Sequence, residues 1–385
     1  MRVSPVVTAW SAPRAWMAAG LLGLVAACGD HASTTQTPPP PALSGMFLGA
    51  DVSSLARIEQ AGGVFRDGGQ AGDAIAILHA HGSNGFRLRL FVNPPDTDVI
   101  VNDLPYTVAL AQRVKAAGAK LLLDIHYSDT WADPGHQTTP AAWSSLGIDS
   151  LATRVQSYTD SVVRTLKQAG ALPDIVQVGN EIDSGMLWPT GQLYVNGADT
   201  TVAWNQFTRL LKAGIAGVRA ALGPGDSVRI MLHYGQGGDV GGTEWFFDHM
   251  NGYGVPYDVI GLSYYPWWHG TIGALEANLQ AAEQRYGKDV MVVETSYPWG
   301  GTGWQGIATN TAPMTWAVTP AGQAQYLTDL LAAVANVPGG HGAGVVWWYP
   351  EAIQVSGLYI WGGGSLSLFD ASGNVLPAAS AFAAR

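Results

Sequence analysis

Two glutamates, Glu181 and Glu294, each stand at the end of a short apolar run that is typical of a buried β-strand. The runs are DIVQVGNE at 174–181 and DVMVVE at 289–294. A buried carboxylate is costly unless it has a partner or a task, and the chain contains only seven Glu residues. We therefore expect the fold to bring these two together. Cleavage of a glycosidic bond requires one carboxyl that donates a proton and a second that either attacks the anomeric carbon or activates water.

Other polar and aromatic side chains occupy the ends of similar apolar runs. They are Asp51, Arg87, Arg89, Asp124, His126, Asn180, His233, Tyr264, Tyr265, Trp347 and Trp348. An arginine close to a nucleophilic carboxylate would keep it ionised, whereas burial beside a negative partner would keep the acid protonated. Asn180, directly before Glu181, is well placed to hydrogen-bond the sugar hydroxyl next to the reacting carbon.

The elements that must position these residues follow from the apolar pattern. Eight strand-like runs are found at 47–51, 85–91, 120–127, 174–181, 227–234, 258–265, 289–294 and 344–350. Amphipathic helical stretches lie between most of them, at 73–82, 107–118, 152–170, 207–222, 274–287 and 321–337. Eight strands alternating with helices predict a single (β/α)8 TIM barrel of the α/β class.

In such a barrel the active site lies at the C-terminal ends of the strands, where the polar residues are found. An open doubly wound sheet is the alternative fold. That fold usually carries a glycine-rich phosphate turn after its first strand, and GADVSS at 49–54 is not such a turn.

Longer stretches resemble one family within the clan of retaining (β/α)8-barrel glycosidases. Its members are the arabinogalactan endo-β-1,4-galactanases of glycoside hydrolase family 53. The stretches that carry the resemblance are GADVSS (49–54), FRLRLFVNPP (86–95), LLLDIHYSDTWADPGHQ (121–137), VQVGNEI (176–182), GLSYYPWW (261–268) and VVETSYPW (292–299). The resemblance covers the chain from about Leu48 to Glu351.

The resemblance implies roles for individual residues. Glu181 matches the family's acid/base, Glu294 its nucleophile and Asn180 the residue that holds the neighbouring hydroxyl. Either Arg87 or Arg89 should stand beside the nucleophile, and we favour Arg89. Either Tyr264 or Tyr265 should touch the nucleophile. The remaining residues expected to line the sugar sites are His126, Asp129, Trp131 and Trp347.

The chain departs from its relatives after the seventh strand. Bacterial members often carry an acidic calcium loop there, but residues 296–314 contain no Asp or Glu to bind a hard cation. We expect Trp299 and Trp304 of this loop either to contact substrate or to cover the barrel end. A zinc site would have to use Asp124, His126 and His233, which lack close-spaced ligand pairs. We therefore expect no metal and no cofactor.

Composition limits the partners. The formal net charge of −10 disfavours a nucleic-acid partner, whose phosphates would be repelled. The 15 Trp residues are more than packing needs, and flat aromatic faces often stack sugar rings. Trp188, Trp267 and Trp268 could either bind sugar in this way or form the cores of their loops. We expect a polysaccharide partner and a monomer.

The N-terminus has the features of an export signal. Arg2 and Arg14 precede an apolar run at 15–27, which is too short to span a bilayer comfortably. Its end, Val25-Ala26-Ala27-Cys28, resembles the lipobox of bacterial lipoproteins; an ordinary secretory signal with an incidental cysteine is the alternative. We expect a signal peptide at 1–27, a lipid-bearing Cys28 with a Pro-rich tether at 28–44, and the catalytic domain at 45–385. Such a protein would be held at the cell envelope, most simply at the outer membrane, or released.

The sequence thus predicts an endo-acting hydrolase of β-1,4-galactan that uses a retaining double displacement. Another endo-glycanase of the same clan, acting on β-mannan or β-glucan, would share the glutamate pair and differ in substrate. A catalytically silent galactan-binding protein would keep the aromatic groove and lose the pair, which this chain retains.

Overall fold

Eight parallel strands close into a barrel in the computed structural model, which describes residues 43–194 and 199–383. The order around the barrel is β1, β12, β11, β10, β9, β6, β5 and β4. The strands are β1 (Phe47–Asp51), β4 (Gly85–Leu90), β5 (Lys120–Ile125), β6 (Ile175–Val178), β9 (Arg229–Tyr234), β10 (Val259–Tyr264), β11 (Asp289–Thr295) and β12 (Gly342–Trp347). Each falls on one of the eight predicted runs, so the predicted barrel is confirmed and the open sheet is excluded.

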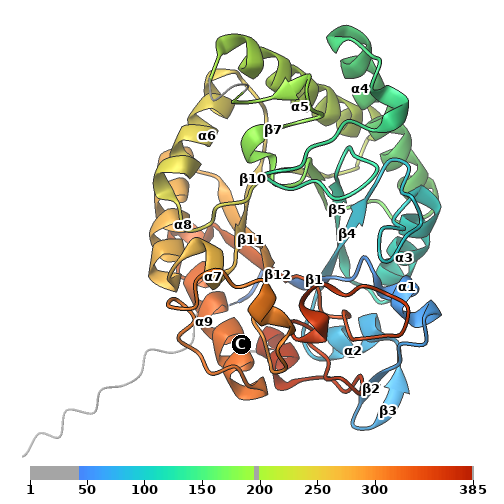
Figure 1. Ribbon diagram of the computed structural model, residues 1–385. Coiled ribbons are helices and arrows are strands. Elements are labelled where there is room, and N and C mark those ends of the chain that lie inside the picture. Colours follow the sequence, from blue (N-terminus) through green and yellow to red (C-terminus); the bar gives the residue numbers. More distant parts are fainter. Residues whose placement is uncertain (1–42, 195–198, 384–385) are drawn as a thin grey trace, which may run out of the picture. The chain divides into compact units, whose positions relative to one another are not determined.

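Helices form an outer ring around these strands (Figure 1). They are α1 (Leu55–Gln60), α2 (Ala74–Ala80), α3 (Leu104–Ala116), α4 (Ile148–Gln168), α5 (Thr201–Ala221), α6 (Val240–Gly252), α7 (Pro266–His269), α8 (Ile272–Tyr286) and α9 (Pro320–Ala335). All six predicted helices are present. The sequence analysis missed three helices. Two of them, α1 and α7, have only six and four residues. The third, α6, has the segment VGGTEWFFDHMNG, whose three glycines and three adjacent aromatic residues obscure its period.

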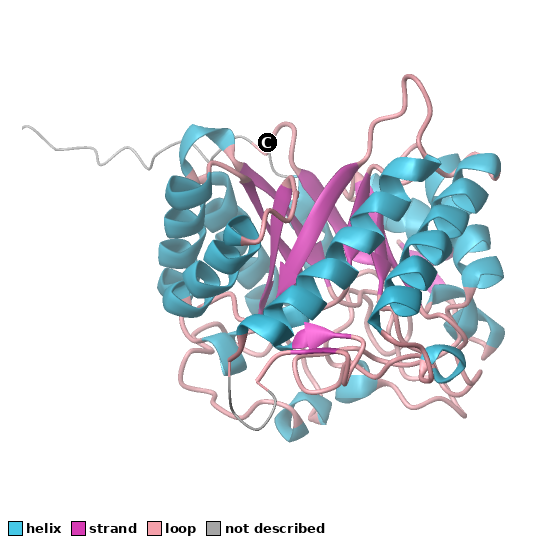
Figure 2. Cartoon of the chain, turned by 90° about the horizontal axis from the view of Figure 1, so that it is seen from above, coloured by secondary structure: helices cyan, strands magenta, loops and turns pink. Residues whose placement is uncertain are grey.

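Two short hairpins accompany the barrel. One pairs β2 (Phe65–Asp67) with β3 (Gln70–Gly72), and the other pairs β7 (Gly185–Met186) with β8 (Gly191–Gln192). The second hairpin directly follows β6 and so belongs to the end of the barrel where the strands stop. Long loops gather at that end, at the bottom of the view in Figure 2.

Side chains that alternate along the strands fill the barrel interior. One apolar layer contains Phe47, Leu122, Ile175, Met231, Val259, Met291, Val293 and Val346. Because side chains two residues apart point to the same face of a strand, further inward positions follow toward the carboxyl ends. They include Arg87, Asp124, Gln177, His233 and Ser263, which are all at most 1% exposed. An apolar floor thus supports a buried polar layer.

The barrel closes between β1 and β4 through two glycines. Gly49 pairs with Gly85, and a Cβ placed on Gly49 would lie 1.9 Å from the Gly85 carbonyl oxygen. A Cβ on Gly85 would in turn lie 2.5 Å from the Phe47 ring. Only glycine fits this approach, which sets the relative position of the strands that carry Asp51 and Arg87.

The described part of the chain contains no helix that is both long and apolar enough to cross a membrane. The predicted signal peptide at 1–27 lies outside the described residues, as do Cys28 and nearly all of the tether at 28–44.

Candidate active site

Glu181 stands just beyond β6 in an unusual backbone conformation. Gly179 has φ +86° and Glu181 has φ +42°, so the chain turns sharply where the strand ends. A non-glycine residue in this left-handed region costs about 1–3 kcal/mol and persists only where its surroundings hold it. Gln137 supplies part of that hold, because its Nε2 donates to the carbonyl oxygens of Asn180 at 2.8 Å and Glu181 at 3.1 Å.

The Glu181 carboxyl is oriented by a short hydrogen-bonded chain. Ser263 Oγ donates to Glu181 Oε1 at 2.6 Å. His233 Nε2 lies 2.9 Å from the same Oγ, while Gln177 Nε2 and the Glu181 backbone N–H both point at His233 Nδ1. Asn180 Oδ1 also lies 3.0 Å from Nδ1, so the His233 ring connects Asn180, Gln177 and the Glu181 backbone on one side to Ser263 on the other. Burial first, and the nearby Arg87 next, lower the pKa of His233 well below its usual value and keep the ring neutral.

Glu294 reaches the same space because β11 carries an irregularity. Along the β10–β11 ladder Leu262 pairs with Val292, but the next residue, Ser263, pairs with Glu294. The extra residue in β11 is a bulge, which breaks the alternation. Val293 faces the barrel interior, yet Glu294 lines the cavity above it rather than facing the helices.

Two groups hold the Glu294 carboxylate. Arg87 Nη1 lies 2.8 Å from Oε1, and the Tyr265 hydroxyl donates to Oε2 at 3.2 Å. We favoured Arg89 as the arginine at this position, and that prediction is wrong. Arg89 Nη2 instead donates to Ser54 Oγ at 2.8 Å, and its guanidinium lies 4.2 Å from the centre of the Trp131 ring.

Every nitrogen of the Arg87 guanidinium is engaged. Nη1 also contacts Asp51 at 3.0 Å, Nη2 contacts Asp124 at 2.8 Å and Asn180 Oδ1 at 2.7 Å, and Nε donates to Gln177 at 3.3 Å. Burial acts to raise the pKa of Asp124, but the attraction of Arg87 and His126 holds it below its usual value. Arg87 is therefore a fixed cation that joins the Glu294 carboxylate to the strand carrying Asn180.

The two glutamates differ in their electrostatic surroundings. Burial raises the pKa of Glu181 well above its usual value, and the negative charges of Glu294 and Asp183 raise it further. Burial also raises the pKa of Glu294, but there Arg87 is the strongest opposing influence. Glu294 is therefore the carboxyl that ionises first, and Glu181 the one that keeps its proton.

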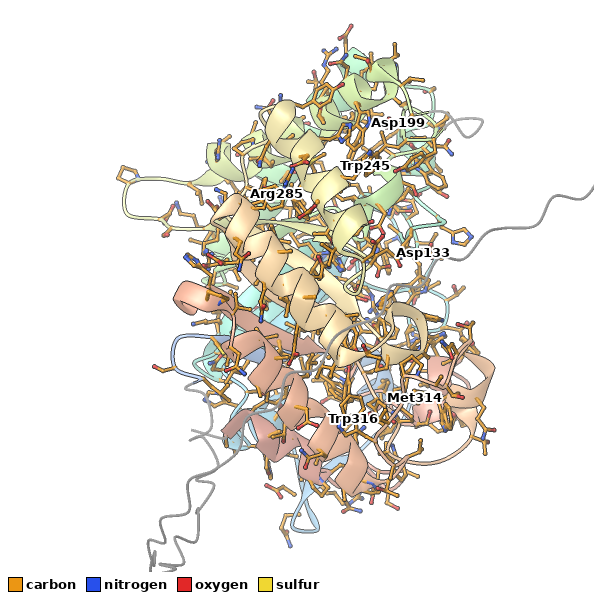
Figure 3. The ribbon with its side chains drawn as sticks, turned by 90° about the vertical axis from the view of Figure 1, so that its left-hand side faces the viewer. Asp133, Asp199, Trp245, Arg285, Met314 and Trp316 are labelled. Carbon is orange, nitrogen blue, oxygen red and sulfur yellow. The ribbon has the colours of Figure 1, made fainter. Side chains whose placement is uncertain are left out.

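A cavity of about 760 Å³ opens over both carboxyls. Its aromatic wall consists of Trp131, Tyr265, Trp268, Trp348, Tyr349, Tyr359 and Trp361. Figure 3 shows Asp133, which also lines the cavity, at one end of the barrel and Arg285, near the C-terminal end of α8, at the other. Flat aromatic faces beside a carboxyl pair suit a sugar polymer, whose rings present apolar faces for stacking.

Several predicted residues do line this cavity: Glu181, Glu294, Asn180, Arg87, Arg89, His126, Trp131 and Tyr265. His126 accepts from the Ala132 N–H at Nδ1 and lies 2.9 Å from Asp124 through Nε2. Asn180 uses one amide hydrogen on the Ala132 carbonyl oxygen, which leaves the other for a ligand.

Three predicted residues do not line the cavity. Tyr264 points away from the barrel interior, and its hydroxyl donates to the Gly270 carbonyl oxygen. Trp347 is fully buried on the outer face of β12 and donates to the Leu366 carbonyl oxygen at 2.9 Å. Asp129 accepts from the backbone N–H groups of Asn93 and Ala141, so both of its oxygens hold loops together.

The alternation of side chains along a strand could have distinguished Tyr265 from Tyr264 and Trp348 from Trp347. Val259 and Val346 face the barrel interior, so Tyr265 and Trp348 share their face whereas Tyr264 and Trp347 do not. The sequence alone gave no starting point for that count, because both runs are apolar at nearly every position. Ser263 and Gln137, which support Glu181, were missed because neither is a charged or aromatic residue.

The loop after β11 covers the barrel end rather than reaching the cavity. Trp299 donates to the Gly364 carbonyl oxygen and Trp304 to that of Gly301. Trp304 packs against the buried cluster of Tyr265, Trp267 and Leu366. Trp267 is 1% exposed and so forms a loop core, whereas Trp268 is 45% exposed and lines the cavity. Trp188 donates to the Ser184 carbonyl oxygen within its own loop. Among the described residues, no group of three or more His, Cys, Asp or Glu could hold a metal ion.

A closed (β/α)8 barrel with two glutamates, one of which holds its proton more strongly than the other, beneath an aromatic cavity defines a glycoside hydrolase. The family model described as "Glycosyl hydrolase family 53" matches residues 47–382, and the chain belongs to this family.

Similar proteins agree with this assignment. A Niallia circulans protein described as an "Uncharacterized protein in bgaB 5'region" is 43% identical over 350 residues, covering 88% of this chain and 93% of its own. An "Arabinogalactan endo-beta-1,4-galactanase" of Thermothelomyces thermophilus is 34% identical, covering 87% and 98%. The solved Ignisphaera aggregans GH53 catalytic domain is 32% identical, with a TM-score of 0.81 and coverage of 89% and 97%.

Proposed function

We propose that this protein cleaves internal β-1,4-galactosidic bonds of galactan or arabinogalactan with retention of anomeric configuration. The observation that carries the proposal is the unequal glutamate pair, with Glu294 held against Arg87 and Glu181 surrounded by negative charge. The substrate comes from the family and from the named activity of the Thermothelomyces thermophilus relative.

In the first step, a carboxylate oxygen of Glu294 attacks the anomeric carbon and forms a covalent galactosyl ester. The bond to the leaving oxygen breaks, and Glu181 transfers its proton to that oxygen. Ser263 donates to Glu181 Oε1 throughout, which stabilises the carboxylate that Glu181 becomes. Arg87 and Tyr265 keep the Glu294 oxygens in place before attack.

In the second step, Glu181 acts as a base. It takes a proton from water, whose oxygen attacks the anomeric carbon from the side the leaving group vacated. The ester bond to Glu294 breaks and Glu294 leaves as a carboxylate. Glu181 is protonated again, so one water is consumed and both residues return to their starting states. The free Asn180 amide hydrogen is positioned for the adjacent sugar hydroxyl.

The test of this proposal is incubation with separate solutions of β-1,4-galactan, arabinogalactan, β-mannan and cellulose. We expect a ladder of galacto-oligosaccharides and a rapid fall in viscosity with the first two substrates, since internal cleavage shortens chains before it frees monomer. Preferential release from mannan or cellulose would point to the other clan endo-glycanases. Binding of galactan without any released sugar would point to a silent binding protein.

We also propose that the chain is exported, that Cys28 carries the lipid anchor, and that the catalytic domain acts as a monomer at the cell envelope. The support is the apolar run at 15–27 that ends in Val25-Ala26-Ala27-Cys28. Expression in a lipoprotein-processing bacterium with a radiolabelled fatty acid should label the wild-type protein and not Cys28→Ser. An unlabelled wild-type protein in the medium would favour the secretory signal, and light scattering would report the mass in solution.

A further inference from the structure

Asp183 is a buried carboxyl that the two-glutamate mechanism does not use. It lies in η2 (Ile182–Ser184), the short 3-10 turn that directly follows Glu181, and is 9% exposed. Its Oδ1 accepts from the Gly235 backbone N–H at 2.6 Å. Gln236 lies nearby, but within residues 43–194 and 199–383 no well-formed hydrogen bond reaches Oδ2.

The carboxyls of Asp183 and Glu181 both lie close to Gly235. A Cβ placed on Gly235 would lie 3.2 Å from Asp183 Oδ2 and 3.2 Å from Glu181 Oε1. The two oxygens therefore lie within twice that distance of each other, and Pro134 Cγ lies 3.1 Å from the same Cβ position. The unpartnered Oδ2 of Asp183 and the Oε1 of Glu181, which accepts from Ser263, thus lie on the same side of Gly235.

We propose that Asp183 is a positioning residue that acts through Glu181, and that its negative charge holds the proton on Glu181 and extends hydrolysis to higher pH. The inference rests on the proposed function of Glu181 as the acid. Two carboxylates this close repel each other, so the second to ionise does so at higher pH. Burial raises the pKa of Asp183 to about 7, so the charge is present on the alkaline side of neutrality.

Other ionisable groups also face these two carboxyls from the elements packed against them. Those near Glu181 are Glu294 of β11, Tyr265 of β10, His233 of β9 and Asp133 of the loop after β5. Those near Asp183 are Tyr234 of β9 and Tyr194 of the loop after β8. Neither tyrosine ionises near neutrality, because burial raises the pKa of Tyr194 to about 12 and that of Tyr234 further still.

The test compares the pH dependence of kcat/KM on galactan for the wild-type enzyme and Asp183→Asn. Asparagine keeps the size of the side chain and an oxygen for the Gly235 N–H. We expect the alkaline limb to move to lower pH by about one unit, a roughly tenfold loss of rate on that limb, while the acid limb stays in place. A role confined to folding would lower activity at every pH and leave the limb unmoved, which would overturn the proposal.

A matched control removes a charge far from the site. Asp248 of α6 pairs with Arg285 at 2.7 Å at the opposite end of the barrel, so Asp248→Asn should leave both limbs in place. If Asp183→Asn does not fold, Asp183→Ser offers the same measurement with a smaller side chain. A limb that stays in place, or moves to higher pH, in the folded variant contradicts the proposal.

A second measurement does not depend on turnover. Carbon-13 NMR of protein labelled at the glutamate side-chain carboxyls follows only seven signals, and Glu181→Gln assigns the relevant one. The Glu181 signal should titrate about one unit lower in Asp183→Asn than in the wild type. An unchanged titration sinks the Asp183 inference alone, whereas an enzyme that fails to cleave galactan but shows the shift sinks only the proposed substrate.

Discussion

Glu294 and Glu181 are chemically the same residue, and their neighbours give them different roles. Arg87 lies 2.8 Å from Glu294, while Glu181 accepts from a neutral serine and is faced by Glu294 and Asp183. The sequence could predict both glutamates because each ends an apolar run. It could not choose between Arg87 and Arg89, since both share one face of β4 and only their height in the barrel separates them.

Removing either glutamate should have distinguishable kinetic consequences. Glu294→Ala should lower kcat on galactan to below about one ten-thousandth of the wild-type value, because no covalent ester can form. Glu181→Ala should lose about 10²- to 10⁴-fold on galactan. It should lose far less in forming the ester from a dinitrophenyl β-galactoside, whose leaving group needs no proton. Stopped-flow absorbance measures this; equal losses on both substrates would contradict the acid role of Glu181.

Arg87 should affect the acid limb of the pH profile. Arg87 acts to lower the pKa of Glu294, so weakening that contact lets Glu294 bind a proton at higher pH. Arg87→Lys, which cannot reproduce the forked contacts, should therefore move the acid limb of kcat/KM upward. The limb should stay in place in Arg89→Lys, because Arg89 contacts Ser54 and Trp131 rather than Glu294. The reverse pattern would restore our sequence-based preference for Arg89.

At the scale of the elements, the site depends on the alternation of side chains along the strands. The bulge in β11 is the one place described above where this alternation is broken to bring a residue into the site. The alternation brings Arg87, Asp124, Gln177, His233 and Ser263 into one buried layer. Glu294 joins the site only because the β10–β11 ladder skips a residue. The sequence predicted that strand, but not its bulge, because a bulge depends on pairing with a neighbour. The loop contacts of Asp129, with Asn93 and Ala141, could not be predicted for the same reason, because they also depend on distant parts of the chain.

Barrel closure at β1 and β4 should be sensitive to a single methyl group. Gly49→Ala would place a Cβ 1.9 Å from the Gly85 carbonyl oxygen, so the strands must separate. We expect a loss of about 2 kcal/mol or more in the free energy of unfolding, measured by chemical denaturation. Gly252→Ala is the control, since a Cβ there meets nothing within 4 Å and helix propensity favours alanine. Equal stability of Gly49→Ala and the wild type would contradict the close approach.

At the scale of the whole molecule, the site rests on buried carboxyls that other parts of the chain hold in place. Glu351, beyond β12, accepts from the Ser54 N–H at 2.8 Å and is fully buried. Burial, together with the charge of Asp51, raises its pKa to about 8. The sequence predicted the barrel from eight apolar runs. It could not predict the burial of Glu351, because the hydrogen-bond partner of this residue, Ser54, lies 297 residues away along the chain.

Glu351 should make the protein less stable as pH rises. Its pKa is raised from 4.5 when exposed to about 8 when folded, so between these values the folded state binds more protons than the unfolded state. Unfolding free energy therefore falls across that window, by less than about 5 kcal/mol from this group. Glu351→Gln should flatten the decline, as measured by chemical unfolding at pH 5 and pH 8. An unchanged slope would show that Glu351 does not titrate in this window.

The account as a whole depends on a double displacement at Glu294 with β-galactan as substrate. Proton NMR of wild-type enzyme with β-1,4-galactan reports the anomeric form of new reducing ends before mutarotation. We predict that the β-anomer appears first and the α-anomer follows only at the spontaneous rate. Initial appearance of the α-anomer would mean inversion, and the absence of new reducing ends would remove galactan as the substrate.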